Sequence, residues 1–143
     1  MTETFTIFSI ILDLTFMSKV WKEIIGIDEA GRGPLAGPVV VAGVRMELRS
    51  KHYELRMLKG IRDSKQLSLK QREKWFALLT SHPSVAWAVA RITPTIIDRI
   101  NIYQAAQLGC RRVYQQLSPD CSAYALLDGS LYLPARISHE TII

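Results

Sequence analysis

The chain has 143 residues, which is enough for one domain with a hydrophobic core. Hydrophobic residues make up 48% of it, which excludes an intrinsically disordered chain. The net charge is +5 and uneven, because the segment from Arg45 to Lys74 holds ten Lys and Arg against four Asp and Glu, whereas the rest holds eight against nine. This local excess favours a polyanion such as nucleic acid as a partner, with a merely solvated surface as the alternative.

The cysteines and histidines give no sign of a soft-metal site. Cys110 and Cys121 form no CxxC pair, so both read as ordinary small apolar residues in a reducing, cytoplasmic compartment. His52, His82 and His139 lie far apart without the spacing of zinc ligands.

The first sixteen residues differ from the rest of the chain. Residues 5–12 are apolar but too few to span a bilayer, and Glu3 stands where a signal peptide would carry basic residues. Met17 is a sensible start just ahead of the first strand. We therefore expect residues 1–16 to be an unstructured or start-site extension, residues 17–143 to form the domain, and no membrane partner.

Two apolar runs, residues 24–27 and 39–44, flank a turn rich in glycine and proline. Both predict short buried strands. Asp28 and Glu29 follow the first run, so we expect them where the strand ends in a loop. Carboxylates at such a place are costly unless they are paired, hydrogen-bonded or bound to a cation, which indicates a metal site. Since neighbours on a strand point to opposite faces, Glu29 must leave regular strand geometry if both acids serve one site.

Gly31, Arg32 and Gly33 add a second feature to this turn. The glycines let backbone N–H groups come close to a ligand, and the arginine fork suits a phosphate. Taken alone, these residues also fit an ordinary acidic turn with an arginine nearby. The whole string over residues 28–42, DEAGRGPLAGPVVVA, is far more specific and resembles the first signature of ribonuclease HII.

A helix is predicted after residues 45–66, a connector rich in charged residues. Ser68 is the expected N-cap and Gln71 completes a capping box three residues later. The helix is expected to run to about Thr80 and to bury Leu69, Phe76 and Leu79.

Ser64 and Lys65 stand just ahead of this helix, within a string RDSKQL that resembles the second signature of the family. They could hold a backbone phosphate of a nucleic acid. The alternative is a capping loop with a solvent-facing lysine.

Residues 85–92 alternate in character and predict a strand. The small residues on one face favour a helix packed closely against it. That face holds Ala86, Ala88, Ala90 and Ile92, and the other holds Val85, Trp87 and Val89.

A short helical turn is predicted at Thr93 and Pro94, followed by a longer helix that Asn101 caps and Pro119 ends. The string INIYQA at residues 100–105 resembles a helix start of the same family. The apolar positions of this helix are Ile102, Ala105, Ala106, Gly109, Val113 and Leu117.

Residues 124–127 predict a short strand that ends at Asp128 and Gly129. A plain Asp-Gly turn is the alternative, but the position after a helix and the resemblance to the strand-Asp-Gly signature of the family favour a functional acid. Residues 137–143 begin a further apolar stretch.

Strands followed by helix-strand alternation predict an α/β fold with a mixed sheet and helices on its faces. The resemblance, which covers residues 22–143, implies the ribonuclease H-like fold, incomplete at the C-terminus.

Asp28, Glu29 and Asp128 are the expected catalytic and metal-binding residues. Hard carboxylate oxygens suit Mg²⁺ or Mn²⁺, and paired ions can activate water and stabilise the leaving oxygen of a phosphodiester. The resemblance implies hydrolysis of the RNA strand of RNA–DNA hybrids and at single ribonucleotides in duplex DNA. It also implies that the turn at residues 31–33 reads the ribose 2′-OH.

The implied setting is the cytoplasm, where a monomer removes misincorporated ribonucleotides or primers during DNA replication and repair. Members of the family also use a fourth carboxylate, an Asp in a helix after the fifth strand, and a downstream Tyr. The 143 residues supply neither. We therefore expect the chain alone to cleave poorly and to recover with a segment that bears this Asp. A metal- and nucleic-acid-binding fragment without turnover is the alternative.

Overall fold

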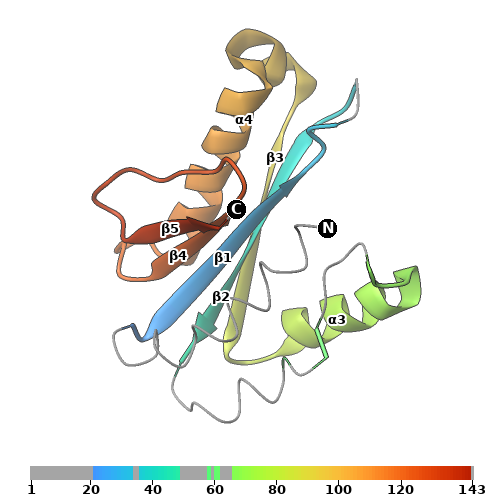
Figure 1. The fold of residues 1–143 in the computed structure, drawn as a ribbon, viewed down its shortest axis with the longest axis vertical. Coiled ribbons are helices and arrows are strands. Elements are labelled where there is room, and N and C mark those ends of the chain that lie inside the picture. Colours follow the sequence, from blue (N-terminus) through green and yellow to red (C-terminus); the bar gives the residue numbers. More distant parts are fainter. Residues whose placement is uncertain (1–20, 34–35, 49–57, 59, 62–65, 143) are drawn as a thin grey trace.

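The computed structural model describes residues 21–33, 36–48, 58, 60–61 and 66–142. In these residues a five-stranded sheet has the order β3-β2-β1-β4-β5 (Figure 1). β1 and β2 pair antiparallel, as do β2 and β3, whereas β4 runs parallel to both β1 and β5. The predicted mixed sheet is therefore confirmed. The strands are β1 (Glu23–Ala30), β2 (Val39–Glu47), β3 (Val85–Ile92), β4 (Tyr124–Asp128) and β5 (His139–Ile142).

Two helices lie on opposite sides of the sheet (Figure 1). α4 (Pro94–Leu117) crosses β2 and β3 on one face. α3 (Leu69–Ser81) lies beside β3 on the other, where the ring centroids of Phe76 and Trp87 are 6.3 Å apart. The predicted capping box is present, because Gln71 N–H donates to Ser68 Oγ and Ser68 N–H donates to Gln71 Oε1.

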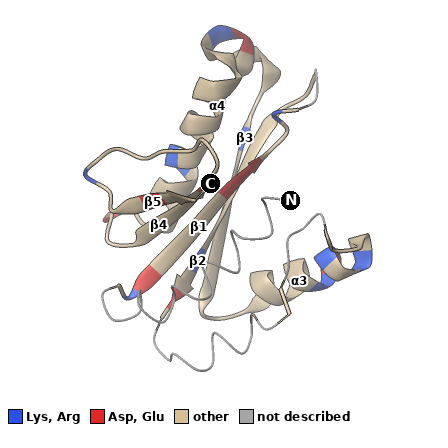
Figure 2. Ribbon diagram, viewed as in Figure 1, with Lys and Arg blue, Asp and Glu red and all other residues tan. Residues whose placement is uncertain are grey.

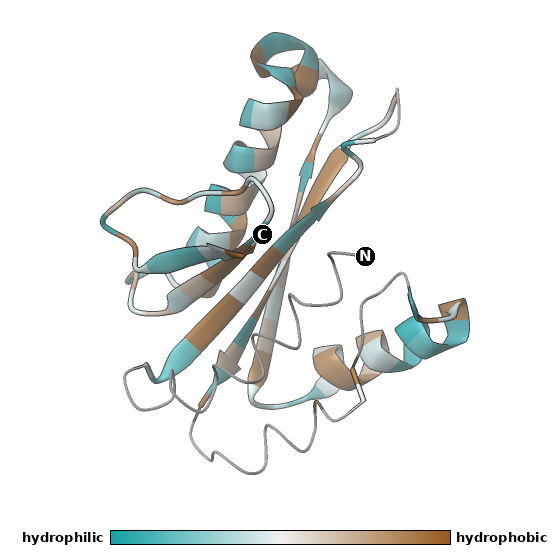
Figure 3. Cartoon of the chain, in the orientation of Figure 1, coloured by the Kyte–Doolittle hydropathy of each residue, from teal (hydrophilic) through white to brown (hydrophobic). Residues whose placement is uncertain are grey.

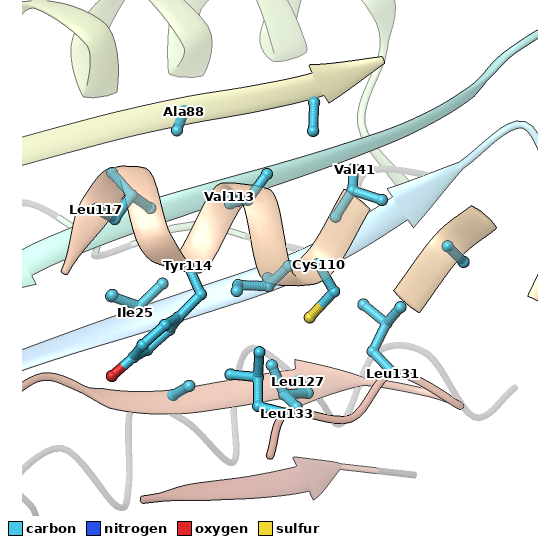
Figure 4. Close-up of a cluster of buried hydrophobic side chains, with 14 of the residues drawn as sticks. Ile25, Val41, Ala88, Cys110, Val113, Tyr114, Leu117, Leu127, Leu131 and Leu133 are labelled. Carbon is cyan, nitrogen blue, oxygen red and sulfur yellow. The ribbon is translucent and has the colours of Figure 1, made fainter. Parts of the chain in front are cut away.

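The hydrophobic core lies between α4 and the sheet (Figure 4). The apolar side chains of α4 pack on the inward residues of the strands, and the small side chains of β3 face this helix as predicted. Figure 3 shows β1 hydrophobic through its middle and hydrophilic toward its carboxyl end. The buried Tyr114 hydroxyl donates to the Ala123 carbonyl over 2.8 Å, which ties α4 to the start of β4.

Glycines allow α4 to approach the sheet closely. A Cβ built on Gly109 would lie 2.5 Å from Val41 Cγ2, and one on Gly43 would lie 2.4 Å from Val113 Cγ1. Real Cβ atoms do not come this close to neighbouring carbons, so the packing of α4 on β2 requires a residue without a side chain at each position.

Asn101 interrupts α4 with φ of 67°, and its side-chain oxygen accepts from Gln104 N–H over 2.9 Å. The predicted short helix and longer capped helix are therefore present as two segments joined at this residue. An Asn tolerates the left-handed conformation because its short polar side chain bonds locally. The second segment ends at Leu117, before Pro119, as predicted.

Two predictions about the elements were wrong. β1 runs to Ala30, so Asp28 and Glu29 lie within the strand rather than in a loop, because β2 continues the antiparallel ladder opposite them. The side chains of α3 are not buried: Leu69 is 65% exposed and Phe76 is 64% exposed. Among the described residues, α3 packs mainly against the edge strand β3, and its Leu79 packs against a small apolar cluster on that face, which leaves most of its side chains exposed.

Three predicted features lie outside the described residues: the extension at residues 1–16, Ser64 and Lys65. None of the described helices combines the length and the hydropathy needed to cross a membrane.

The close approach at Gly109 can be tested by Gly109→Ala. Overpacking against Val41 costs roughly 1–3 kcal/mol, which exceeds the helix-propensity gain of about 1 kcal/mol. We expect a lower free energy of unfolding in urea. Gly26→Ala is the matched control, because a Cβ there meets no atom of the described residues within 4 Å. Equal stability of the two variants would show that α4 does not pack this closely.

Candidate active site

The parallel pairing of β1 with β4 brings two acids together. Ile27 pairs with Leu127, and the same register continued by one residue places Asp28 beside Asp128. Both side chains point away from α4, because Ile27 and Leu127 belong to the core beneath that helix and strand residues alternate. The carboxyl groups are close enough to share a hydrogen bond when one is protonated.

The pKa of Asp28 is raised from 3.8 to about 6. Partial burial of its carboxyl group is the largest cause, although the residue as a whole is exposed, and the Asp128 carboxylate is the next. The backbone N–H of Glu29, which donates to Asp28 Oδ1 over 2.6 Å, opposes the shift. Two carboxylates that repel each other at one end of a sheet are stabilised by a proton or a cation between them.

Glu29 points to the opposite face of β1 from Asp28. Its Oε1 accepts from Arg32 Nη1 over 2.8 Å, and the same nitrogen donates to Ser130 Oγ over 2.6 Å. The other carboxylate oxygen, Oε2, is buried and has no hydrogen-bond partner among the described residues. A buried carboxylate oxygen without a partner is costly, so this atom marks a place where a further donor or cation would be stabilised.

The expected departure of Glu29 from strand geometry is not seen, because Glu29 pairs with Val41 in the regular β1–β2 ladder. Among the described residues there is consequently no group of three Asp, Glu, His or Cys side chains spaced to hold a metal ion. The paired oxygens of Asp28 and Asp128 nevertheless fit the preference of Mg²⁺ or Mn²⁺ for hard ligands. The structure thus forms a two-carboxylate site, with Glu29 next to it in sequence but on the other face.

The turn after β1 is tight at its first glycine and open at its second. Gly31 has φ of 92°, and a Cβ there would lie 2.5 Å from the Pro38 carbonyl oxygen. A Cβ on Gly33 would meet nothing within 4 Å. Gly31 is therefore required by the backbone itself, whereas no described atom fills the position that a side chain on Gly33 would take.

The described basic residues of the segment from Arg45 to Lys74 include structural and exposed ones. Arg45 donates to the Leu117 carbonyl at the end of α4 over 2.8 Å and lies 3.7 Å from Glu23, so it holds the fold together. Lys70 and Lys74 are exposed on α3. Figure 2 shows these basic residues along α3 and acidic residues near the carboxyl end of β1, in separate parts of the molecule.

Sequence reasoning missed two residues beside the site. Ser130 holds Arg32, and the fully buried Gln107 bonds the backbone of the loop after β4. The available signal for Gln107 was a lone amide among the apolar residues of a predicted helix face. Cys110 is buried in the apolar core, as predicted, and burial and then the nearby Glu29 carboxylate raise the pKa of its thiol to about 12.

Comparison with known proteins decides the family. The sequence profile of ribonuclease HII matches residues 25–127. The chain belongs to the ribonuclease HII family. The ribonuclease HII of Xanthomonas campestris pv. campestris (strain 8004) is 42% identical to it over 118 residues, which are 82% of this chain and 46% of that protein.

Solved structures confirm the ribonuclease H-like fold. The ribonuclease H2 from Pyrococcus horikoshii OT3 superimposes with a TM-score of 0.60 and 25% identity over 83% of this chain and 61% of that one. Bst-RNase HIII in complex with Mn²⁺ has a TM-score of 0.56 and 19% identity over 82% of this chain and 40% of that one, a likeness of fold alone. The chain thus spans about half the length of this ribonuclease HII relative.

The raised pKa of Asp28 predicts that the folded chain loses stability as pH rises. In the folded, metal-free chain Asp28 binds a proton more tightly than in the unfolded chain, so the free energy of unfolding should fall as pH rises from about 4 to about 6. Asp28→Asn removes this loss, and we expect the variant to be more stable than the native chain at pH 7 by about 1 kcal/mol after solvent screening.

Urea unfolding at pH 4 and pH 7 in a chelating buffer measures this difference. Asp98→Asn, at an exposed position of α4, is the control and should change stability little at either pH. A native chain more stable at pH 7 than Asp28→Asn would contradict the proposed repulsion.

Proposed function

We propose that this chain is the metal- and substrate-binding part of a nuclease that cuts the RNA strand of RNA–DNA hybrids and cuts at single ribonucleotides in duplex DNA. The observation that carries the proposal is the Asp28–Asp128 pair at the carboxyl ends of two parallel strands, in a chain of the ribonuclease HII family. Acids so placed destabilise the fold unless something binds them, so a role in binding explains them better than a role in folding.

Asp28 and Asp128 would hold a divalent cation, Mn²⁺ or Mg²⁺. Bound ions of this kind lower the pKa of water and stabilise the leaving oxygen of a phosphodiester. Glu29 is the further catalytic carboxylate of the proposal, and its Oε2, which bonds none of the described residues, is the atom available for that role. A two-metal mechanism requires more ligands than the Asp28–Asp128 pair alone.

The turn at residues 31–33 would recognise the ribonucleotide. A Cβ on Gly33 would meet no described atom within 4 Å, so a ligand could approach its backbone, and the Gly33 N–H could bond the ribose 2′-OH that distinguishes RNA from DNA. The guanidinium of Arg32, 36% exposed at its side chain, would add attraction for the phosphate backbone.

The basic residues of α3 would bind the phosphate backbone of the duplex without regard to its base sequence. Lys70 and Lys74 are exposed on α3 and suit phosphate contacts that weaken with salt. Ser64 and Lys65 belong to the same proposal. The proposed setting is a monomer in the cytoplasm that removes misincorporated ribonucleotides or primers.

A fragment that binds metal and nucleic acid without turnover is the second candidate. It is favoured by the two-carboxylate geometry, because the described residues bring no third acid to the pair. The two candidates share a substrate and differ only in cleavage.

The proposal predicts a preference for duplex DNA with one ribonucleotide over the all-DNA duplex in the presence of Mn²⁺. Gly33→Ala keeps the backbone N–H but adds a methyl group that should hinder approach of the ribose, so it should reduce this preference by roughly three- to tenfold, the value of one hydrogen bond, without loss of stability. Fluorescence anisotropy measures the binding, and sequencing-gel analysis detects cleavage 5′ to the ribonucleotide that leaves a 3′-hydroxyl.

Lys74→Ala is the control for this experiment, because it should weaken both duplexes equally. An unchanged preference in Gly33→Ala would rule out reading of the 2′-OH by this turn. Preference without Mn²⁺-dependent cleavage would support the fragment, and absence of both would contradict both candidates.

A further inference from the structure

Gln107 is a fully buried amide on the face of α4 that packs against the sheet. Its Nε2 donates to the Ser130 carbonyl over 2.7 Å, and its Oε1 accepts from Tyr132 N–H over 2.9 Å. One planar amide thus satisfies two backbone groups of the loop that follows Asp128. A buried polar side chain is costly unless its hydrogen bonds are made, so both bonds are needed for Gln107 to be tolerated there.

The two bonds hold the backbone of Ser130 and Tyr132, which flank the buried Leu131. Leu131, between the two bonded residues, is 1% exposed and packs in the core. Its carbonyl accepts from Thr141 Oγ1 over 3.1 Å, which ties the segment to β5 as well. Ser130, in contrast, is exposed, and its position is set by its backbone rather than by packing of its side chain.

Ser130 links this segment to the turn after β1 through a side-chain hydrogen bond. Its hydroxyl accepts from Arg32 Nη1 over 2.6 Å, and Arg32 in turn donates to Glu29 Oε1 over 2.8 Å. The orientation of Arg32 therefore decides which oxygen of Glu29 is paired and which remains free.

We propose that Gln107 is a positioning residue that acts through Ser130 to hold the Arg32 guanidinium on Glu29. The inference rests on the proposed function in one respect, namely that Arg32 and Glu29 serve the substrate and the metal. Gln107 itself touches neither acid of the Asp28–Asp128 pair in the hydrogen bonds of the described residues.

The test compares two variants of α4 that each lose a buried bond to a backbone carbonyl. Gln107→Leu removes the bond to the Ser130 carbonyl together with the bond from Tyr132 N–H, and Tyr114→Phe removes the bond to the Ala123 carbonyl. Nuclear magnetic resonance of the Arg32 Nη signals reports how freely the guanidinium rotates, and it needs no nucleic acid or metal. We expect roughly three- to tenfold faster rotation in Gln107→Leu and no change in Tyr114→Phe.

Ser130→Ala supplies the second variant, since an exposed serine can be truncated without loss of the fold. It should free Arg32 to the same extent, and adding Gln107→Leu to it should have no further effect on rotation. Additive effects in the double variant would overturn the proposal, because Gln107 would then act by another route. Unchanged rotation in both single variants would overturn it as well.

Binding of the ribonucleotide-bearing duplex separates this inference from the proposed function. If the native chain shows no preference for that duplex, the proposed function fails while the rotation of Arg32 still decides the role of Gln107. If the native chain shows the preference, Gln107→Leu and Ser130→Ala should both reduce it and Tyr114→Phe should not. A preference retained in both would overturn the link from Gln107 to substrate.

Discussion

The parallel pairing of β1 with β4 is the constraint on which the candidate site depends. It joins segments about a hundred positions apart and sets Ile27 against Leu127, so that the next residue of each strand is an acid. The apolar pair faces α4 and the acids face away, because side chains alternate along a strand. The same pairing therefore builds the core on one face and concentrates negative charge on the other.

The core tolerates this charge because α4 fixes both strands from the opposite side. Gly43 and Gly109 let the helix lie against β2, and Tyr114 fastens it to the residue before β4. A rigid support of this kind is what a functional site needs, since ligands must be held in place against their mutual repulsion. The raised pKa of Asp28 follows from the partial burial of its carboxyl group and from the nearby Asp128 carboxylate.

Much of this arrangement could be predicted from local signals in the sequence. Alternation gave β3, the capping box gave the start of α3, and the spacing of Asn101 and Pro119 gave both ends of the long segment of α4. The resemblance to the family signatures pointed to Asp28, Glu29 and Asp128 as the candidate acids. The exposure of α3 could not be predicted in this way, because an apolar residue at helical spacing does not tell how much surface is available to cover it.

The geometry of Glu29 was beyond prediction for a different reason. Its neighbour Asp28 and the glycines that follow suggested an early end to the strand, but the length of β2 decides where the ladder ends. The roles of Ser130 and Gln107 depend equally on contacts across long stretches of sequence. Pairing between distant segments, rather than local pattern, sets the details of the site.

The central claim is that Asp28 and Asp128 form one electrostatic unit that accepts a divalent cation. Nuclear magnetic resonance of the carboxyl carbons during a pH titration tests it directly, in the native chain and in Asp128→Asn. The account predicts that Asp28 titrates near pH 6 without metal, at a lower pH in Asp128→Asn, and that Mg²⁺ perturbs both carboxyl carbons of the native chain. Titration of Asp28 near pH 4, with neither carbon sensitive to Mg²⁺, would contradict it.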